Sequence, residues 1–389
     1  MKQHTRTKVW RWSACACALL LLAICTAPAS AQVRVVPKQA TGGQAFGEPW
    51  AEVPDSFRYL RDIPEWPVPT NLKSWQATDR EKTRSTVLRL LGEMPPRPDP
   101  RKVVVLATED HGDYTLERFE FFNGVDMAVP GMIVVPKDRR GKVPAVIGLH
   151  GHGSPTSRPK ESLCADPESI GATLARKGYV VAAIDGYFNG ERIGKGPGGA
   201  RDGKDAQEAS LFKLYLLQGR TLWGMMLRDQ QCLIDYLQTR PEVDPERIGA
   251  TGASMGCTGS WWLAAIDERV KAIVGVICFT RYTELLAHGN LRMHGIYYFV
   301  PGVLAHFDTE AIYSLIAPRP MLMLSGDRDG GAPTDGIYVL EKKLGSVYDL
   351  YGRRDDFRSI IYQDTGHEYL PEMKDQMVQW FERHLPSRK

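Results

Sequence analysis

The feature that most constrains the fold is an alternation of short, continuously apolar runs with helical patterns over residues 145–362. An apolar run without polar alternation is typical of a strand that is covered on both faces. Strands of this kind separated by helices predict an α/β fold, a parallel sheet with helices on both faces. The runs expected to form these strands are residues 145–149, 180–184, 247–251, 270–278, 321–324 and 359–362.

Three further runs precede this alternation, with turn residues between them. Residues 103–107, 114–121 and 132–135 are rich in β-branched and aromatic side chains, and their short connections predict antiparallel neighbours. The sheet is therefore expected to be mostly parallel, with an antiparallel first part.

The first 31 residues are typical of a secretory signal peptide. Four basic residues without an acidic one precede residue 13, an apolar stretch follows at 13–26, and Ala29-Ser30-Ala31 matches a small-x-small cleavage site. A membrane anchor is the alternative, but it needs about 18 to 20 apolar residues, more than this stretch has. We expect a signal peptide at 1–31, cleavage after Ala31, and a secreted or periplasmic protein without a stable membrane span.

The net charge depends on this segment. The chain has 49 Lys and Arg against 46 Asp and Glu, a formal net charge of +3, and loss of the four basic residues of the signal segment lowers this charge to −1. A near-neutral chain without a basic patch argues against nucleic acid as a partner. An uncharged ester or a neutral glycan is a better expectation than a polyanion.

The remainder is expected to contain an extension and one large domain. Residues 32–101 are polar and Pro-rich, and only residues 79–91 predict a helix there, with Val87, Leu88 and Leu91 as its apolar face. Residues 102–389 predict the α/β domain, because the apolar runs begin there. Two insertions, at residues 186–210 and 280–318, are expected at the carboxyl ends of strands, where open α/β sheets bind ligands.

The cysteines outside the signal segment are widely spaced. Cys164, Cys232, Cys257 and Cys278 do not form a metal-binding or redox pattern. Buried free thiols and a single disulfide both remain open, and we expect no cofactor.

The sharpest local signal is Gly252-Ala253-Ser254-Met255-Gly256, a G-x-S-x-G motif. It follows an apolar strand and opens a helix, the context in which a sharp turn exposes a nucleophilic serine. A serine hydroxyl needs an imidazole to take its proton and a carboxylate to hold that imidazole. Ser254 is therefore the predicted nucleophile.

The partners are expected later in the chain, in the order acid and then histidine. His367 is the predicted base, because it follows a glycine in a short loop after the last strand. Asp329 is the predicted acid, because the later position in its loop can turn back toward His367, whereas Asp327 is placed to brace the turn. Glu284, after the preceding strand, is the reserve.

Two backbone N–H groups are also required, to stabilise the oxyanion of the tetrahedral intermediate. One is the amide of Met255 at the helix start, and the other is assigned to His152 in the loop His150-Gly151-His152-Gly153. A zinc site at His150 and His152 is the rival interpretation. No carboxylate or cysteine at metal-ligand spacing joins them, so we expect no metal.

Further motifs accompany the G-x-S-x-G motif. With them, residues 114–385 resemble a secreted α/β-hydrolase of the dienelactone hydrolase and acetyl xylan esterase group. The resemblance implies an α/β-hydrolase fold with an eight-stranded, mostly parallel sheet, and a triad of Ser254, Asp329 and His367. The stretches that carry it are Val129-Pro130-Gly131-Met132, His150-Gly151-His152-Gly153, Gly190-Glu191-Arg192, Ala317-Pro318-Arg319-Pro320 and Gly366-His367-Glu368.

Two positions depart from relatives in this group. Cephalosporin-deacetylating members carry an aromatic residue where this chain has His152, and glucuronoyl esterases carry Arg where it has Met255. The aromatic insertion is expected to roof the pocket, with Tyr282, His294 and Tyr297 as candidate substrate-binding residues. Plain packing is the alternative for these three.

Together these patterns predict a secreted serine esterase that hydrolyses small acyl esters, acetyl foremost, on a small molecule or a polysaccharide through an acyl-enzyme. A peptidase or a lactone hydrolase with the same triad is the first alternative. A non-catalytic carbohydrate-binding relative is the second.

Overall fold

The computed structural model describes residues 34–36, 53–59 and 62–387. The predicted signal peptide and its cleavage after Ala31 lie outside these residues. None of the helices in the described ranges is long and apolar enough to cross a membrane.

The centre of the fold is a ten-stranded sheet with the order β1-β10-β9-β8-β7-β5-β6-β4-β3-β2. Neighbours from β1 to β6 in this order run parallel, and β4, β3 and β2 continue the sheet antiparallel. This is the mostly parallel arrangement that the sequence predicted. The strands are β1 (Arg34–Val36), β2 (Val103–Asp110), β3 (Tyr114–Phe122), β4 (Ala128–Pro136), β5 (Val143–Leu149), β6 (Val180–Ile184), β7 (Val243–Ala253), β8 (Val270–Val276), β9 (Met321–Gly326) and β10 (Phe357–Tyr362).

The resemblance implied eight strands and the apolar runs predicted nine, whereas the described residues form ten. The run at 103–107 forms β2 as predicted, and β1, which pairs with β10 at the other edge of the sheet, is the strand that was not predicted. β1 belongs to the extension, and its three residues are too few to show an alternating pattern. Its pairing comes from the neighbouring edge of the sheet, so periodicity could not reveal it.

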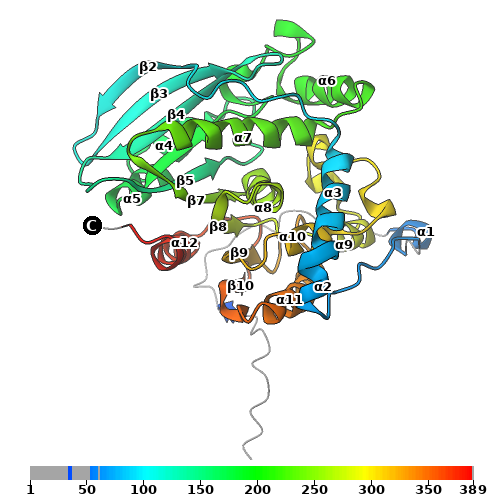
Figure 1. Ribbon diagram of the computed structural model, residues 1–389. Coiled ribbons are helices and arrows are strands. Elements are labelled where there is room, and N and C mark those ends of the chain that lie inside the picture. Colours follow the sequence, from blue (N-terminus) through cyan, green and yellow to red (C-terminus); the bar gives the residue numbers. More distant parts are fainter. Residues whose placement is uncertain (1–33, 37–52, 60–61, 388–389) are drawn as a thin grey trace, which may run out of the picture. The chain divides into compact units, whose positions relative to one another are not determined.

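Helices cover both faces of the sheet, because successive side chains on the central strands point to opposite sides. On β5, Ala145 and Ile147 pack into the core with α7 and α8, while Val146 packs into the core with α5 and α12. Figure 1 shows these helices around the sheet. The helices are α1 (Asp55–Arg58), α2 (Leu72–Ser74), α3 (Arg80–Leu91), α4 (Pro159–Cys164), α5 (Ile170–Arg176), α6 (Lys204–Leu217), α7 (Leu222–Thr239), α8 (Met255–Ile266), α9 (Tyr282–Ala287), α10 (Thr309–Ser314), α11 (Thr334–Leu350) and α12 (Pro371–His384).

The helix predicted in the extension is α3, which follows a π-helical turn at Trp75–Asp79. Val87 and Leu91 are buried as expected, but Leu88 is 36% exposed, so its place in the apolar face was wrong. The reason is geometric: Leu88 lies about 100° around the helix from Val87, whereas Leu91 returns to nearly the same side. The Arg84 guanidinium ties α3 to the main core through a 3.2 Å hydrogen bond to the carbonyl oxygen of Ile266.

All four cysteines outside the predicted signal peptide are buried and unpaired in the structure. Of the two alternatives that the sequence left open, free thiols are therefore the one observed. Burial raises the pKa of Cys164 to about 12, so this thiol stays protonated at neutral pH.

A buried carboxyl group on α11 gives a stability prediction. Glu341 is 5% exposed, and desolvation raises its pKa to about 7, although Ser359 and Arg354 oppose the shift. The folded protein therefore holds a proton that the unfolded chain releases above the ordinary glutamate pKa, and stability is lost as the pH rises through 7. Relative to wild type, we expect the free energy of unfolding of Glu341→Gln to be about 2 kcal/mol higher at pH 8 than at pH 5. Urea unfolding of both proteins at the two pH values measures this, and a difference that does not change with pH would contradict it.

Candidate active site

Ser254 lies in a strained turn between β7 and α8. Its φ of 59° and ψ of −123° are unusual for a residue with a side chain, and its N–H donates to the carbonyl oxygen of Val276 at 2.9 Å. The turn has no space for larger neighbours, because a Cβ at Gly252 or Gly256 would lie 2.3 or 1.9 Å from the carbonyl oxygen of Leu149. Both glycines of the motif are therefore required by the close approach of β5.

The structure brings Ser254 together with the predicted base and acid. His367 Nε2 lies 2.8 Å from Ser254 Oγ, and His367 Nδ1 lies 2.8 Å from Asp329 Oδ2. The acid is buried in the loop after β9, and the histidine is in the loop after β10. Because a carboxylate only accepts, His367 Nδ1 carries the hydrogen and Nε2 is left to accept from the serine hydroxyl.

The other two candidate acids have different contacts. Asp327 Oδ1 accepts the N–H of Thr365 at 3.0 Å, so it joins the acid loop to the histidine loop rather than bracing its own turn. Glu284 on α9 pairs with Arg281 at 2.6 Å. Asp329 is held in place by the N–H of Gly331, which donates to its Oδ1 at 2.8 Å.

The loop after β5 lies directly beside the serine. A Cβ at Gly151 would lie 3.7 Å from the Cβ of Ser254, and the backbone of His152 is held by Asn189 Nδ2, which donates to the His152 carbonyl at 2.7 Å. Met255 is the first residue of α8, where N–H groups have no acceptor within the helix. Met255 thus follows Ser254 directly in the chain, and the loop that contains His152 borders the same cavity as Ser254; the oxyanion hole formed by their amides stays a prediction.

His150 supports this loop through both ring nitrogens. Its Nδ1 lies 2.7 Å from the Gly151 carbonyl oxygen, and its Nε2 accepts the N–H of Gly186 at 2.9 Å. Burial lowers the pKa of His150, which keeps the ring neutral in these two contacts. The ring therefore acts as a brace between two loops.

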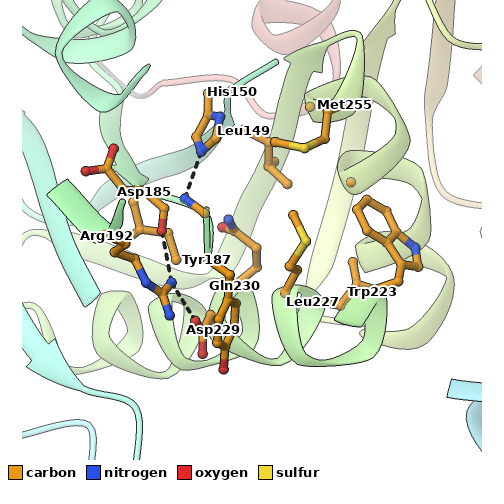
Figure 2. Close-up of a pocket in the computed structure, with 15 residues that line it drawn as sticks. Leu149, His150, Asp185, Tyr187, Arg192, Trp223, Leu227, Asp229, Gln230 and Met255 are labelled. Atoms are coloured by element: carbon orange, nitrogen blue, oxygen red, sulfur yellow. Dashed lines mark hydrogen bonds and ion pairs between the residues drawn. The ribbon is translucent and has the colours of Figure 1, made fainter. Parts of the chain in front are cut away.

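A small cavity of about 30 Å³ is lined by His150 and Met255 (Figure 2). Its far wall contains Arg192, whose guanidinium donates to the Asp185 carbonyl at 3.1 Å and to Asp229 Oδ2 at 2.8 Å. The Gly190-Glu191-Arg192 motif therefore anchors the first insertion to the end of β6 and to α7. A Cβ at Gly190 would lie 2.4 Å from the carboxylate of Asp185, so glycine is required there.

The side chain of His152 contacts two residues that sequence spacing did not reveal. Its Nε2 lies 2.7 Å from Glu208 Oε2, and its Nδ1 lies 2.9 Å from Lys204 Nζ. Both partners are buried at the start of α6, in an insertion without apolar periodicity. The signal in the sequence is the large number of charged residues in this segment, but composition does not tell which of them are buried.

A group of side chains with metal-ligand geometry lies around His152 in the part of the chain that the structure describes. Ligand atoms of His152, Asp205 and Glu208 lie within 4.8 Å of one another, although His152 is distant in the sequence from the two acidic residues, which are neighbours on α6. The ammonium of Lys204 lies among them, 3.3 Å from Asp205 and close to the His152 ring. A cation at this position is thus supplied by the chain itself.

A cavity of about 630 Å³ opens above Ser254 and His367. Of the three predicted substrate-binding residues, His294 and Tyr297 line it, and Tyr282 does not. Tyr282 is buried, donates its hydroxyl to the Tyr298 carbonyl at 2.9 Å and borders a separate cavity. His294 also supports the acid loop, because its Nε2 lies 2.8 Å from the Gly331 carbonyl oxygen, and burial lowers its pKa.

Comparisons with known proteins agree with this architecture. The putative hydrolase YtaP of Bacillus subtilis is 36% identical over 312 residues, which cover 79% of this chain and 100% of that protein. A glucuronoyl esterase from Solibacter usitatus has a TM-score of 0.63 at 16% identity, over 84% of this chain and 100% of its own. A putative acetyl xylan esterase from Bacteroides fragilis has a TM-score of 0.61 at 19% identity, over 83% and 86%.

The two solved structures show that the fold is the α/β-hydrolase fold, which confirms the expected fold class. The model of the Abhydrolase family matches residues 64–335, a stretch that contains Ser254 and Asp329. Together with the relative from Bacillus subtilis, this match establishes that the chain is a hydrolase and belongs to the Abhydrolase family.

Proposed function

We propose that this hydrolase is an exported serine esterase that removes small acyl groups, acetyl foremost, from carbohydrate esters. The observation that carries the proposal is the continuous contact from Ser254 through His367 to Asp329, with both distances at 2.8 Å, beneath an open cavity. In this geometry the imidazole can accept the serine proton while the carboxylate stabilises the imidazolium that forms.

The reaction follows from these positions. Ser254 Oγ attacks the ester carbonyl carbon, and His367 Nε2 takes the hydroxyl proton. The amides of His152 and Met255 stabilise the oxyanion, and His367 returns the proton to the leaving alcohol. Water then attacks the acyl-enzyme with His367 as base, releasing the carboxylic acid and restoring Ser254.

Two features favour a carbohydrate ester as the substrate. The cavity combines the aromatic ring of Tyr297 with polar groups, among them His152, Asp205 and Arg292, which suits the faces and hydroxyls of a sugar. Two solved structures with this fold are a putative acetyl xylan esterase and a glucuronoyl esterase. This chain has Met255 where glucuronoyl esterases carry an arginine, which favours an uncharged ester.

The test is a comparison of substrates with a covalent probe of the serine. We expect the protein to release acetate from acetylated xylan and from p-nitrophenyl acetate, and to act more slowly on a lactone and on a peptide anilide. A fluorophosphonate is expected to label Ser254, identified by mass spectrometry of the digest. Absence of labelling would overturn the serine mechanism, and a preference for the anilide or the lactone would assign the site to the corresponding alternative.

A further inference from the structure

Glu208 lies where three segments of the active site meet. It is 4% exposed and belongs to α6, at the end of the first insertion. Its Oε2 lies 2.7 Å from the ring of His152 in the loop after β5, and its Oε1 accepts the backbone N–H of Tyr297 at 3.1 Å. One carboxylate thus joins the loop beside Ser254 to the segment that roofs the cavity.

We infer that Glu208 is a positioning residue for the oxyanion hole. The inference rests on the proposed function, in which the His152 backbone amide stabilises the oxyanion. The position of that amide depends on what holds the residue: Asn189 holds its carbonyl, Tyr297 stacks on its ring at 5.5 Å, and Glu208 fixes the ring nitrogen. Tyr297 belongs to the segment that roofs the cavity, and Glu208 contacts both this segment and the loop of His152 through one carboxylate.

The hydrogen-bond directions along this contact follow from the chemistry of its members. A carboxylate only accepts, so His152 Nε2 carries the hydrogen and donates it to Glu208. The ammonium of Lys204 lies 2.9 Å from His152 Nδ1 and 3.0 Å from Nε2, and Nδ1 is the nitrogen that is left to accept from it. A buried carboxylate is costly unless a positive group balances it, and here the ammonium of Lys204, on the other side of the His152 ring, supplies that charge.

A carboxylate is the group that this junction requires. It must accept from two donors at once, and each oxygen of Glu208 serves one of them. A glutamine has nearly the same shape but one acceptor oxygen, so it can satisfy either His152 or Tyr297 but not both. The roof also approaches closely, since a Cβ at Gly295 would lie 2.5 Å from Glu208 Oε1.

The experiment is a kinetic comparison of wild type with Glu208→Gln on p-nitrophenyl acetate. We expect kcat to fall by about 10- to 100-fold while KM stays within about twofold, because the oxyanion contact is made in the transition state and not in the ground state. The rate of Ser254 labelling by a fluorophosphonate should fall by a similar factor. The melting temperature should stay within about 4 °C, since Asp205 still lies 3.3 Å from the Lys204 ammonium.

Glu341→Gln is the matched control, because it makes the same exchange at a buried carboxyl group on α11 and should leave kcat within about twofold of wild type.

Glu208→Asp keeps two acceptor oxygens and should retain more activity than the glutamine variant. If Glu208→Gln does not fold, a fall in kcat with unchanged KM for Glu208→Asp supports the inference. Unchanged kcat in the folded variants, or a rise in KM alone, would overturn it. A wild-type protein without esterase activity would instead overturn the proposed function and this inference with it.

Discussion

Ser254→Ala is expected to lower kcat for a small acyl ester by at least about 10⁴-fold, with the fold and substrate binding retained. The variant loses the oxygen that lies 2.8 Å from His367 Nε2, so no acyl-enzyme can form. The residual rate would come from the oxyanion donors and from binding alone. Steady-state hydrolysis of p-nitrophenyl acetate measures this, and fluorophosphonate labelling should disappear in parallel.

Ser260→Ala is a control on the same helix. Ser260 is also buried, and its hydroxyl donates to the Cys257 carbonyl within α8. Its loss should leave kcat within about twofold of wild type, because the side chain acts inside the helix. Activity that survives Ser254→Ala at more than about one per cent of wild type would rule out this serine as the nucleophile.

The second large effect is expected for Asp329→Asn, a fall in kcat of about 10²- to 10⁴-fold with a small change in KM. An asparagine amide that faces His367 would donate to Nδ1, and the hydrogen of the ring would then be on Nε2. Nε2 could no longer accept the proton of Ser254, although the shape of the buried site is unchanged. Steady-state kinetics over a pH series measure the loss.

Two variants separate Asp329 from the other candidate acids. Glu284→Gln should leave kcat within about twofold of wild type, because that carboxylate pairs with Arg281. Asp327→Asn should cost less than about tenfold, since it weakens one contact, to the N–H of Thr365, between the acid and histidine loops. A larger loss for Glu284→Gln than for Asp329→Asn would transfer the role of acid to Glu284.

Much of the candidate site could be predicted because its parts are local. The G-x-S-x-G turn follows its strand directly, and the acid and histidine follow theirs within a few residues. Parallel strands end at the same edge of a sheet, so residues just after β7, β9 and β10 must come close together. The prediction of Asp329 rather than Asp327 rested on loop geometry of the same local kind, and in the structure the carboxylate of Asp329 lies 2.8 Å from His367.

The supporting residues could not be predicted, because their roles depend on contacts between distant segments. Lys204 and Glu208 lie in a polar segment where exposed and buried charges look alike, yet both contact His152, more than 50 residues earlier. The metal interpretation of His152 was tested by spacing along the sequence alone, which could not reveal Asp205 and Glu208. Tyr282 resembled Tyr297 in the sequence, but packing placed it outside the cavity of Ser254.

By itself the sequence determined the α/β class, the order of the strands along the chain and which serine, histidine and aspartate lie together, Ser254, His367 and Asp329. These follow from periodicity and from chemistry at strand ends, which are short-range properties. The tertiary structure decided which charges are buried, how the first insertion braces the loop of His152, and that a further strand, β1, extends the sheet. Burial and long-range pairing depend on which segments meet, and a linear pattern does not contain that information.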